Sequence, residues 1–204
     1  PAQRKEHRAE AHHLDPVVMI GNDGLTPAVV FCQLSPKGQL LILDELCADN
    51  MGIDRFGDQV IPYTAQRWPG FAFNDVGDPA GATAAQTDEK TCFAILQSKK
   101  IMIQPGSTQD PTLRVESVKK PLNTMVDGQP GMLIHPRCKM LRKGFQGGYQ
   151  YRRMMTSAEK YTDKPDKNQY SHPHDALQYV ATKLFGSVLT ASSAKPVDYK
   201  SLYR

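Results

Sequence analysis

The sequence predicts an α/β domain in which a mixed central sheet carries helices on both faces. Three short apolar, β-branched segments follow one another between residues 17 and 47, and an amphipathic helical pattern covers 52–68. From residue 71 to residue 134, segments of strand and helix character alternate. An antiparallel meander followed by β–α units is the order expected of a mixed sheet with its first strand near the centre.

The meander is predicted from three apolar segments at 17–20, 27–33 and 39–47. Each is short and rich in Val, Ile or Leu, as strands are. The second and third segments are separated by residues 35–38, where Pro36 and Gly38 are typical of a tight turn. These residues therefore predict two antiparallel connections in succession.

The remaining elements are predicted from periodicity and from helix end signals. Pro62 should kink or end the first helix, Thr87 is the expected cap of the second, and Pro111 suits the first turn of the third. Gly186 is expected to stop the last helix. The expected elements are helices at 52–68, 88–98, 111–125, 137–143 and 175–184, strands at 71–76, 101–103 and 131–134, a hairpin from Gly147 and a polar loop at 160–169.

Length and composition fit one globular domain, with 204 residues of which 40% are hydrophobic. We expect a linker remnant at 1–15, one domain at 16–186 and a flexible tail at 187–204. No apolar run approaches the length needed to cross a bilayer, so no membrane partner is expected. The four cysteines lack zinc-site spacing, and we interpret them as reduced thiols.

Acidic residues occur at three places where ligand sites form in such sheets, the ends of strands. Asn22 and Asp23 end the first strand, Asp78 ends the fourth, and Asp175 opens the last predicted helix. Converging carboxylates repel one another unless cations compensate them. Two Mg²⁺ or Mn²⁺ ions would do so, and such a pair activates water and stabilises the leaving oxygen of a phosphodiester. Taken singly, each residue has a simpler reading as a turn residue or helix cap.

Four segments together resemble, in the same order, motifs of the nuclease domain of large terminase subunits of tailed bacteriophages. They are GNDGLTPAVVF at 21–31, DEL at 44–46, GDPAG at 77–81 and SHPHDALQY at 171–179. The resemblance spans roughly 16–186 and implies a ribonuclease H-like fold. It also implies that Asp78 and Asp175 are the second and third metal-binding carboxylates.

The first carboxylate position departs from the family pattern, which is similar to G-x-D-x-G-L-T-P-A and is one residue longer than the segment here. Alignment from Gly21 makes Asp23 the ligand, whereas alignment back from the GLTPA residues makes it Asn22. Neighbouring side chains of a strand point to opposite faces, so only one of the two can serve. We favour Asp23 because an amide binds a hard cation poorly. The alternative, Asn22, would make the chain an inactive or weakly metal-binding variant.

Weaker candidates for a supporting role are Asp44 and Glu45 at the end of the third strand and His172 and His174 before Asp175. The two histidines flank Pro173, and no further imidazole or thiolate lies near them at zinc-site spacing, so we do not expect zinc. All four also fit purely structural roles, as an acidic strand end and as loop residues at a helix start.

The basic residues are concentrated between 137 and 167, although the net charge is only +4. A positive face beside the acidic residues would bind DNA phosphates, and tyrosines in the predicted hairpin would pack on sugar or base. An ordinary solvated basic loop and hairpin is the competing interpretation. The predicted DNA-binding residues are Arg142, Lys143, Tyr149, Tyr151, Arg152 and Arg153.

The resemblance implies a metal-dependent endonuclease that cuts concatemeric viral double-stranded DNA during genome packaging in the host cytoplasm. Its implied partners are an N-terminal ATPase domain, the small terminase subunit and the portal. No phosphate-binding Gly-x4-Gly-Lys-Ser/Thr loop occurs in the sequence, so an ATPase is expected before residue 1. Two alternatives stay open, another ribonuclease H-like nuclease of the junction resolvase or integrase type, and a non-catalytic DNA-binding module of a packaging machine.

Overall fold

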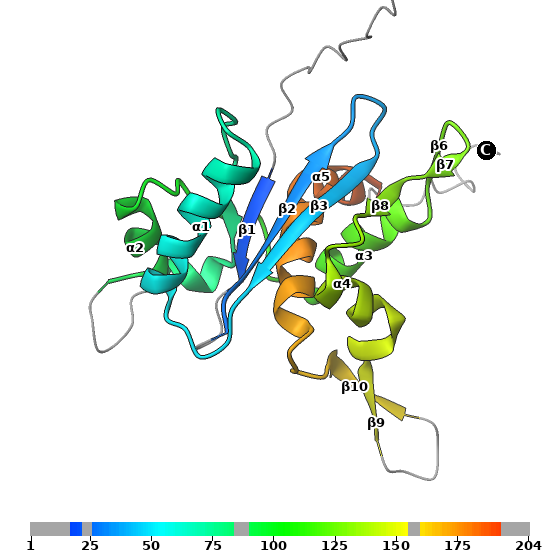
Figure 1. Cartoon of the computed structure of the whole chain (residues 1–204). Coiled ribbons are helices and arrows are strands. Elements are labelled where there is room, and N and C mark those ends of the chain that lie inside the picture. The colour runs from blue at the N-terminus through cyan, green and yellow to red at the C-terminus, as the bar shows by residue number, and fades with distance from the viewer. Residues whose placement is uncertain (1–16, 22–25, 84–89, 155–159, 193–204) are drawn as a thin grey trace, which may run out of the picture.

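A six-stranded mixed sheet forms the centre of the molecule, in the order β5-β4-β1-β2-β3-β8 (Figure 1). The computed structural model describes residues 17–21, 26–83, 90–154 and 160–192. The strands of the sheet are β1 (Val17–Gly21), β2 (Ala28–Leu34), β3 (Leu40–Cys47), β4 (Val76–Gly77), β5 (Gln104–Pro105) and β8 (Met132–Ile134). The first three form the predicted antiparallel meander, and β4, β5 and β8 add to it in parallel.

A β-bulge in β3 changes which face its side chains occupy. Phe31 of β2 pairs with Asp44, whereas the next residue, Cys32, pairs with Ile42, so Leu43 has no partner of its own. The extra residue of a bulge shifts the alternation of side chains between the two faces of the sheet, so residues before and after Leu43 follow different registers with β2. Ile42 packs in the core on one face, while Asp44 lies opposite Phe31, which packs in the core on the other.

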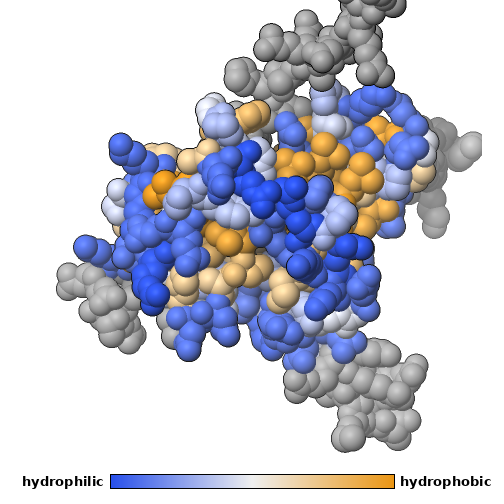
Figure 2. Space-filling view, in the orientation of Figure 1, coloured by the Kyte–Doolittle hydropathy of each residue, from blue (hydrophilic) through white to orange (hydrophobic). Residues whose placement is uncertain are grey.

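Two hydrophobic cores cover the two faces of the sheet (Figure 1). On one face, α1 (Ile53–Arg67) and α2 (Cys92–Ser98) bury Phe56, Val60 and Leu96 against Val29 and Phe31. On the other face lie α3 (Pro111–Leu122), α4 (Lys139–Lys143) and the long helix α5 (Ser171–Ser192). The predicted arrangement with helices on both faces is therefore confirmed. A further apolar area is visible on the β8 side in Figure 2, where Leu133 is 42% exposed.

Several predicted boundaries are wrong. Helix α2 begins one turn later than expected, and its cap is Thr91, whose Oγ1 accepts from the amide of Ala94 at 2.9 Å; Thr87 lies outside the described residues. Of the expected strand at 71–76, only Val76 lies in the sheet, as the first residue of β4 (Val76–Gly77). The strand expected at 101–103 is displaced to Gln104–Pro105.

The C-terminal part differs most from the predicted elements. The expected polar loop at 160–169 contains β10 (Lys160–Pro165), which pairs with β9 (Tyr151–Met154) to form the predicted hairpin. Helix α5 begins four residues earlier than expected and continues past Gly186 to Ser192. Although α5 is long, no helix among the described residues is both long and apolar enough to cross a bilayer. Three short elements complete the chain, β6 (Met125–Val126), β7 (Gln129–Pro130) and the helical turn η2 (Gly144–Gly148).

A buried carboxylate, Asp75, precedes β4 and lowers the stability of the fold when it ionises. It is 6% exposed, and its Oδ1 has no hydrogen-bond partner among the described residues. Burial raises the pKa of Asp75 to about 6, and the nearby Lys183 opposes this shift only in part. Because the folded pKa lies above the unfolded value, the folded state binds more protons between pH 4 and pH 6, and stability falls as pH rises through this range.

We predict that Asp75→Asn makes the domain more stable than the wild type at pH 8 and nearly equal to it at pH 4. A shift of this size corresponds to a gain on the order of 3 kcal/mol at pH 8. Urea unfolding at the two pH values measures the change, with the exposed Asp49→Asn as the control. An equal effect of Asp75→Asn at both pH values would contradict the proposed ionisation.

Candidate active site

Asp78 follows β4 directly and stands at the end of the central sheet. It caps the short helical turn η1 (Pro79–Ala82), where its Oδ1 accepts from the amide of Ala80 at 2.9 Å. Gln109 Nε2 reaches the same oxygen at 3.4 Å. A side chain on Gly77 would lie 2.5 Å from Ile103 and 2.8 Å from Phe93, so only glycine fits before Asp78 in this packing. The Tyr179 hydroxyl also hydrogen-bonds the Asp78 carboxylate.

Asp175 lies in the second turn of α5, and two cationic side chains bind its carboxylate. Arg114 Nη2 of α3 donates to Oδ1 at 2.6 Å, and Lys167 Nζ, from the loop before α5, donates to Oδ2 at 3.0 Å. The Asp175 side chain is 18% exposed, so it remains accessible from solvent. Asp175 is therefore not the helix-opening residue that was predicted, because Ser171 begins the helix.

The structure brings Asp78 and Asp175 together in one pocket of about 260 Å³, although 97 residues separate them in the chain. We call it the site pocket. Its lining is Asp78, Gln109, Pro111, Arg114, Val115, Tyr149, Tyr151, Pro165, Lys167, Ser171, Asp175, Gln178 and Tyr179. The loops and helices that meet there come from both halves of the chain, from the end of β4, from α3, from the hairpin and from α5.

Tyr179 connects the parts of the site pocket. It lies one helical turn after Asp175 and is 1% exposed, and the Arg114 guanidinium carbon lies 4.2 Å from its ring centroid. Burial raises the pKa of Tyr179, and the carboxylates of Asp78 and Asp175 raise it further, whereas Arg114 opposes the shift. A side chain on Gly106 would lie 2.7 Å from the Tyr179 ring, so a glycine is required beside it.

The donor set of the site pocket fits a hard divalent cation, because it offers carboxylate oxygens and no thiolate or imidazole. Among the described residues, no three or more acidic, histidine or cysteine side chains gather in a way that would hold a metal. The predicted first position, Asn22 or Asp23, lies outside the described residues. The strand before it runs parallel to β4, with Met19 level with Val76 and Ile20 level with Gly77. Gly21 therefore ends β1 next to the point where Asp78 follows β4.

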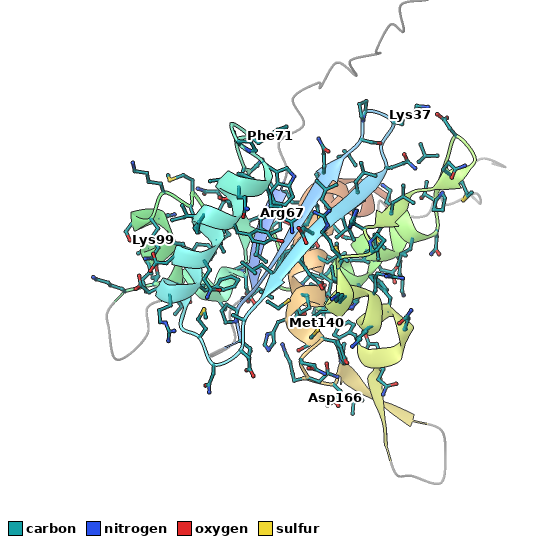
Figure 3. All side chains as sticks on the ribbon, viewed as in Figure 1. Lys37, Arg67, Phe71, Lys99, Met140 and Asp166 are labelled. Carbon is teal, nitrogen blue, oxygen red and sulfur yellow. The ribbon has the colours of Figure 1, made fainter. Side chains whose placement is uncertain are left out.

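Asp44 and Glu45 do not line the site pocket. Asp44 is 2% exposed and lies among Tyr63, whose hydroxyl donates to it at 2.7 Å, Arg137 at 3.4 Å and Arg67 at 3.6 Å. Arg67 extends from α1 (Figure 3). Glu45 accepts the amides of Met140 and Leu141 at 2.5 and 3.0 Å and so caps α4. Strand alternation explains this separation, because the adjacent side chains of Asp44 and Glu45 point to opposite faces of the sheet and so reach different helices.

The two histidines have different surroundings. His174 is 4% exposed, its Nε2 contacts the carbonyl of Leu141 at 3.1 Å, and its ring stacks on Tyr149 at 4.7 Å. Burial lowers the pKa of His174 to about 4, which makes it a neutral core residue at pH 7. His172 contacts Thr26 Oγ1 at 2.7 Å, just before β2.

The predicted DNA-binding residues divide into two groups. Tyr149 and Tyr151 line the site pocket, and Tyr151 is 44% exposed. Gln178 Nε2 donates to the Tyr149 hydroxyl at 2.9 Å, which fixes that ring beside the carboxylates. Arg142 and Lys143 are exposed on α4 and do not line the site pocket. Arg152 and Arg153 belong to β9, but their side chains lie outside the described residues.

Sequence reasoning did not single out Arg114, Gln109, Gln178 or Tyr179 as site residues. Arg114 and Gln109 belong to no short motif, whereas Gln178 and Tyr179 end the terminase-like segment at 171–179 and were interpreted only as part of an amphipathic helix. Lys167 was noted only as one of many basic residues in its region. A signal was present for Tyr179 alone, since it follows Asp175 at a spacing of four residues on a predicted helix.

Three solved structures of large terminase nuclease domains have this fold. The g2p nuclease domain from bacteriophage SPP1, with bound Mn, matches with a TM-score of 0.53 at 13% identity over 86% of this chain and 88% of that chain. The nuclease domain of the P22 large terminase matches with a TM-score of 0.58 at 8% identity over 86% and 82%. That from thermophilic phage G20c matches with a TM-score of 0.52 at 8% identity over 84% and 82%.

These likenesses confirm the ribonuclease H-like fold predicted from the sequence. At such low identities they concern the fold alone. A family model described as CRS1 / YhbY (CRM) domain matches residues 1–31, a small part of the 204 residues that ends within β2. No curated protein sequence matches the chain.

We predict that Glu45→Gln lowers stability without changing divalent metal binding. A neutral amide retains one oxygen acceptor for the two helix amides that Glu45 now caps, so the expected loss is about 1–2 kcal/mol in urea unfolding. Mn²⁺ affinity, measured by isothermal titration, should equal that of the wild type. A weakened Mn²⁺ affinity with unchanged stability would make Glu45 a ligand instead of a cap.

Proposed function

We propose that this chain is a metal-dependent endodeoxyribonuclease, the nuclease domain of a phage large terminase. Its substrate would be concatemeric viral double-stranded DNA, cut during genome packaging. The observation that carries the proposal is the meeting of Asp78 and Asp175 in one pocket, since these residues come from two separate terminase-like motifs. The fold shared with terminase nuclease domains, one of them with bound Mn, supports the same assignment.

Asp78 and Asp175 would hold two Mg²⁺ or Mn²⁺ ions together with a carboxylate at the end of β1. Bound there, the ions would supply activation of a water and stabilisation of the leaving oxygen of a phosphodiester. The protein's own contribution is to fix the carboxylates. Asp78 is oriented by the amide of Ala80, and Asp175 by Arg114 on α3. Such fixed positions lower the cost of reorganisation when charge develops on the reacting phosphate.

For the third carboxylate we propose Asp23, with Asn22 as the alternative. Both follow Gly21 in the sequence, and Gly21 is one residue beyond the pairing of Ile20 with Gly77. A carboxylate binds Mg²⁺ or Mn²⁺ far better than an amide does, which favours Asp23 on chemical grounds. We propose a supporting role for His172, because it contacts Thr26, which follows this segment in the sequence.

DNA would approach along the basic and aromatic residues beside the site pocket. Tyr149 and Tyr151 form its rim, Lys167 is 63% exposed, and Arg142 and Lys143 are exposed on α4. Lysine and arginine would bind phosphates without reading bases, so we expect low sequence specificity. We further propose that an ATPase domain, the small terminase subunit and the portal bring the DNA to this domain in the host cytoplasm.

We predict that Asp78→Asn and Asp175→Asn each reduce Mn²⁺-dependent nicking of supercoiled plasmid by roughly 100-fold or more, because each removes a metal-binding charge. Asp127→Asn is the matched control, since Asp127 is 65% exposed in the turn between β6 and β7. Urea unfolding verifies that the variants remain folded. Wild-type nicking rates in either site variant would remove that residue from the active site.

A pair of variants tests the first position. We predict that Asp23→Asn abolishes nicking and that Asn22→Asp leaves it near the wild-type rate. A large gain of activity in Asn22→Asp, with little loss in Asp23→Asn, would assign the position to residue 22.

The substrate class is tested separately with linear duplex, four-way branched DNA and RNA–DNA hybrid of the same sequence. Preference for duplex DNA is the outcome expected of a packaging nuclease. A preference for branched DNA would indicate a junction-resolving enzyme, and salt-dependent binding without cleavage at any Mn²⁺ concentration would indicate a non-catalytic module.

A further inference from the structure

Asp175 is held by two cations that differ in how easily they can leave. Arg114 is 12% exposed, and it is fixed between the Asp175 carboxylate and the face of Tyr179. Its Nε is buried without a hydrogen-bond partner among the described residues, so the guanidinium is tightly enclosed. Withdrawing Arg114 would leave the half-buried Asp175 carboxylate without its best-oriented partner, which costs free energy. Arg114 is therefore a permanent neighbour of Asp175.

Lys167 is the opposite case. It is 63% exposed, its ammonium binds the other oxygen of Asp175 at 3.0 Å, and it extends from the loop between β10 and α5. Asp175 is only 18% exposed, but water and salt compete for the exposed ammonium, so this lysine contributes on the order of 1 kcal/mol to the pair. Lys167 can therefore exchange its partner at little cost, while Arg114 keeps the carboxylate oriented.

Lys167 lies between two neighbouring pockets, so its ammonium can also bind a group outside the site pocket. It lines the site pocket and also a neighbouring pocket, which we call the side pocket, of about 760 Å³. The lining of the side pocket mixes polar side chains such as Thr26, Asn168, Gln169 and His172 with apolar ones such as Ala28 and Met140. Its only carboxylate among the described lining residues is Asp49, and a strand of DNA crossing both pockets would pass the ammonium of Lys167.

We propose that Lys167 is a positioning residue that exchanges between Asp175 and a DNA phosphate. In the absence of DNA, its ammonium competes with a divalent cation for Oδ2 of Asp175, because both are positive charges seeking the same oxygen. When a phosphodiester enters, Lys167 binds the phosphate and releases that oxygen to the metal. Metal binding and DNA binding thereby favour one another. This inference rests on the proposed function, since it assigns Asp175 to a metal.

Lys167→Gln tests the exchange by measurements that do not depend on cleavage. In DNA-free protein we expect Mn²⁺ affinity at the site to rise by about three- to tenfold, because a competing charge next to Asp175 is removed. DNA affinity in Ca²⁺ should fall, and its dependence on salt should lessen by about one phosphate contact. The tightening of Mn²⁺ binding when a short duplex is added should be smaller than in the wild type.

The matched control is Lys37→Gln, which removes the same charge from another exposed lysine–carboxylate pair. Lys37 is 66% exposed, binds Asp127 and lies at the tip of the β2–β3 hairpin, at the other end of the molecule from Met140, which lines the side pocket (Figure 3). It should leave Mn²⁺ affinity unchanged and so exclude a general charge effect.

The outcomes separate this inference from the proposed function. Wild-type protein that binds no Mn²⁺ and cleaves no DNA would overturn the proposed function. Wild-type protein that binds Mn²⁺ and cleaves DNA, with Mn²⁺ affinity of Lys167→Gln unchanged or reduced, would overturn the exchange alone. Lys167→Arg provides the conservative variant, and it should restore the wild-type salt dependence of DNA binding.

Discussion

The packing of α5 across one face of the sheet is the constraint on which the candidate site depends. Ala176, Leu177, Val180 and Ala181 are fully buried against the sheet, which fixes the rotation of the helix about its axis. That rotation places Asp175 and Tyr179 on the side that meets α3 and the end of β4. Because burying these four side chains yields several kcal/mol, the helix cannot turn Asp175 away without losing the core. The site is therefore built by hydrophobic packing.

The carboxylates of the domain differ in how their charge is compensated. Three buried or half-buried carboxylates near the sheet have close partners: Asp44 has Tyr63 and two arginines, Glu45 has the amides of α4, and Asp175 has Arg114 and Lys167. Asp78 has only neutral donors, the amide of Ala80, the distant amide of Gln109 and the Tyr179 hydroxyl. Among the described residues no cationic side chain pairs with Asp78, so its negative charge is left for a cation. Asp78 and Asp175 therefore differ in their partners, because two cationic side chains bind the Asp175 carboxylate and none is described at Asp78.

Much of the fold was predictable because it depends on local patterns. The meander follows from three short β-branched segments and one Pro–Gly turn, and α3 begins at Pro111, as its suitability for a first helical turn predicts. The bulge at Leu43 was not predictable, because it depends on how β2 and β3 pair. The extension of α5 past Gly186 also escaped prediction. A single helix glycine costs only about 1 kcal/mol, which the packing of Leu184 and Phe185 against the core offsets.

The candidate site was predictable in part. Asp78 and Asp175 were found because their motifs are specific, whereas the role of Arg114 arises only when α3 packs beside α5. Residues such as Asp44 and His174 were indistinguishable from site residues until their burial and partners were known. A crystal of this domain soaked in Mn²⁺ and measured at the manganese absorption edge would show whether Asp78 and Asp175 share one divalent metal site. We expect an anomalous peak within ligand distance, about 2.0–2.3 Å, of oxygens from both Asp78 and Asp175. Manganese bound elsewhere, with these two carboxylates still engaged only by protein groups, would contradict a shared site.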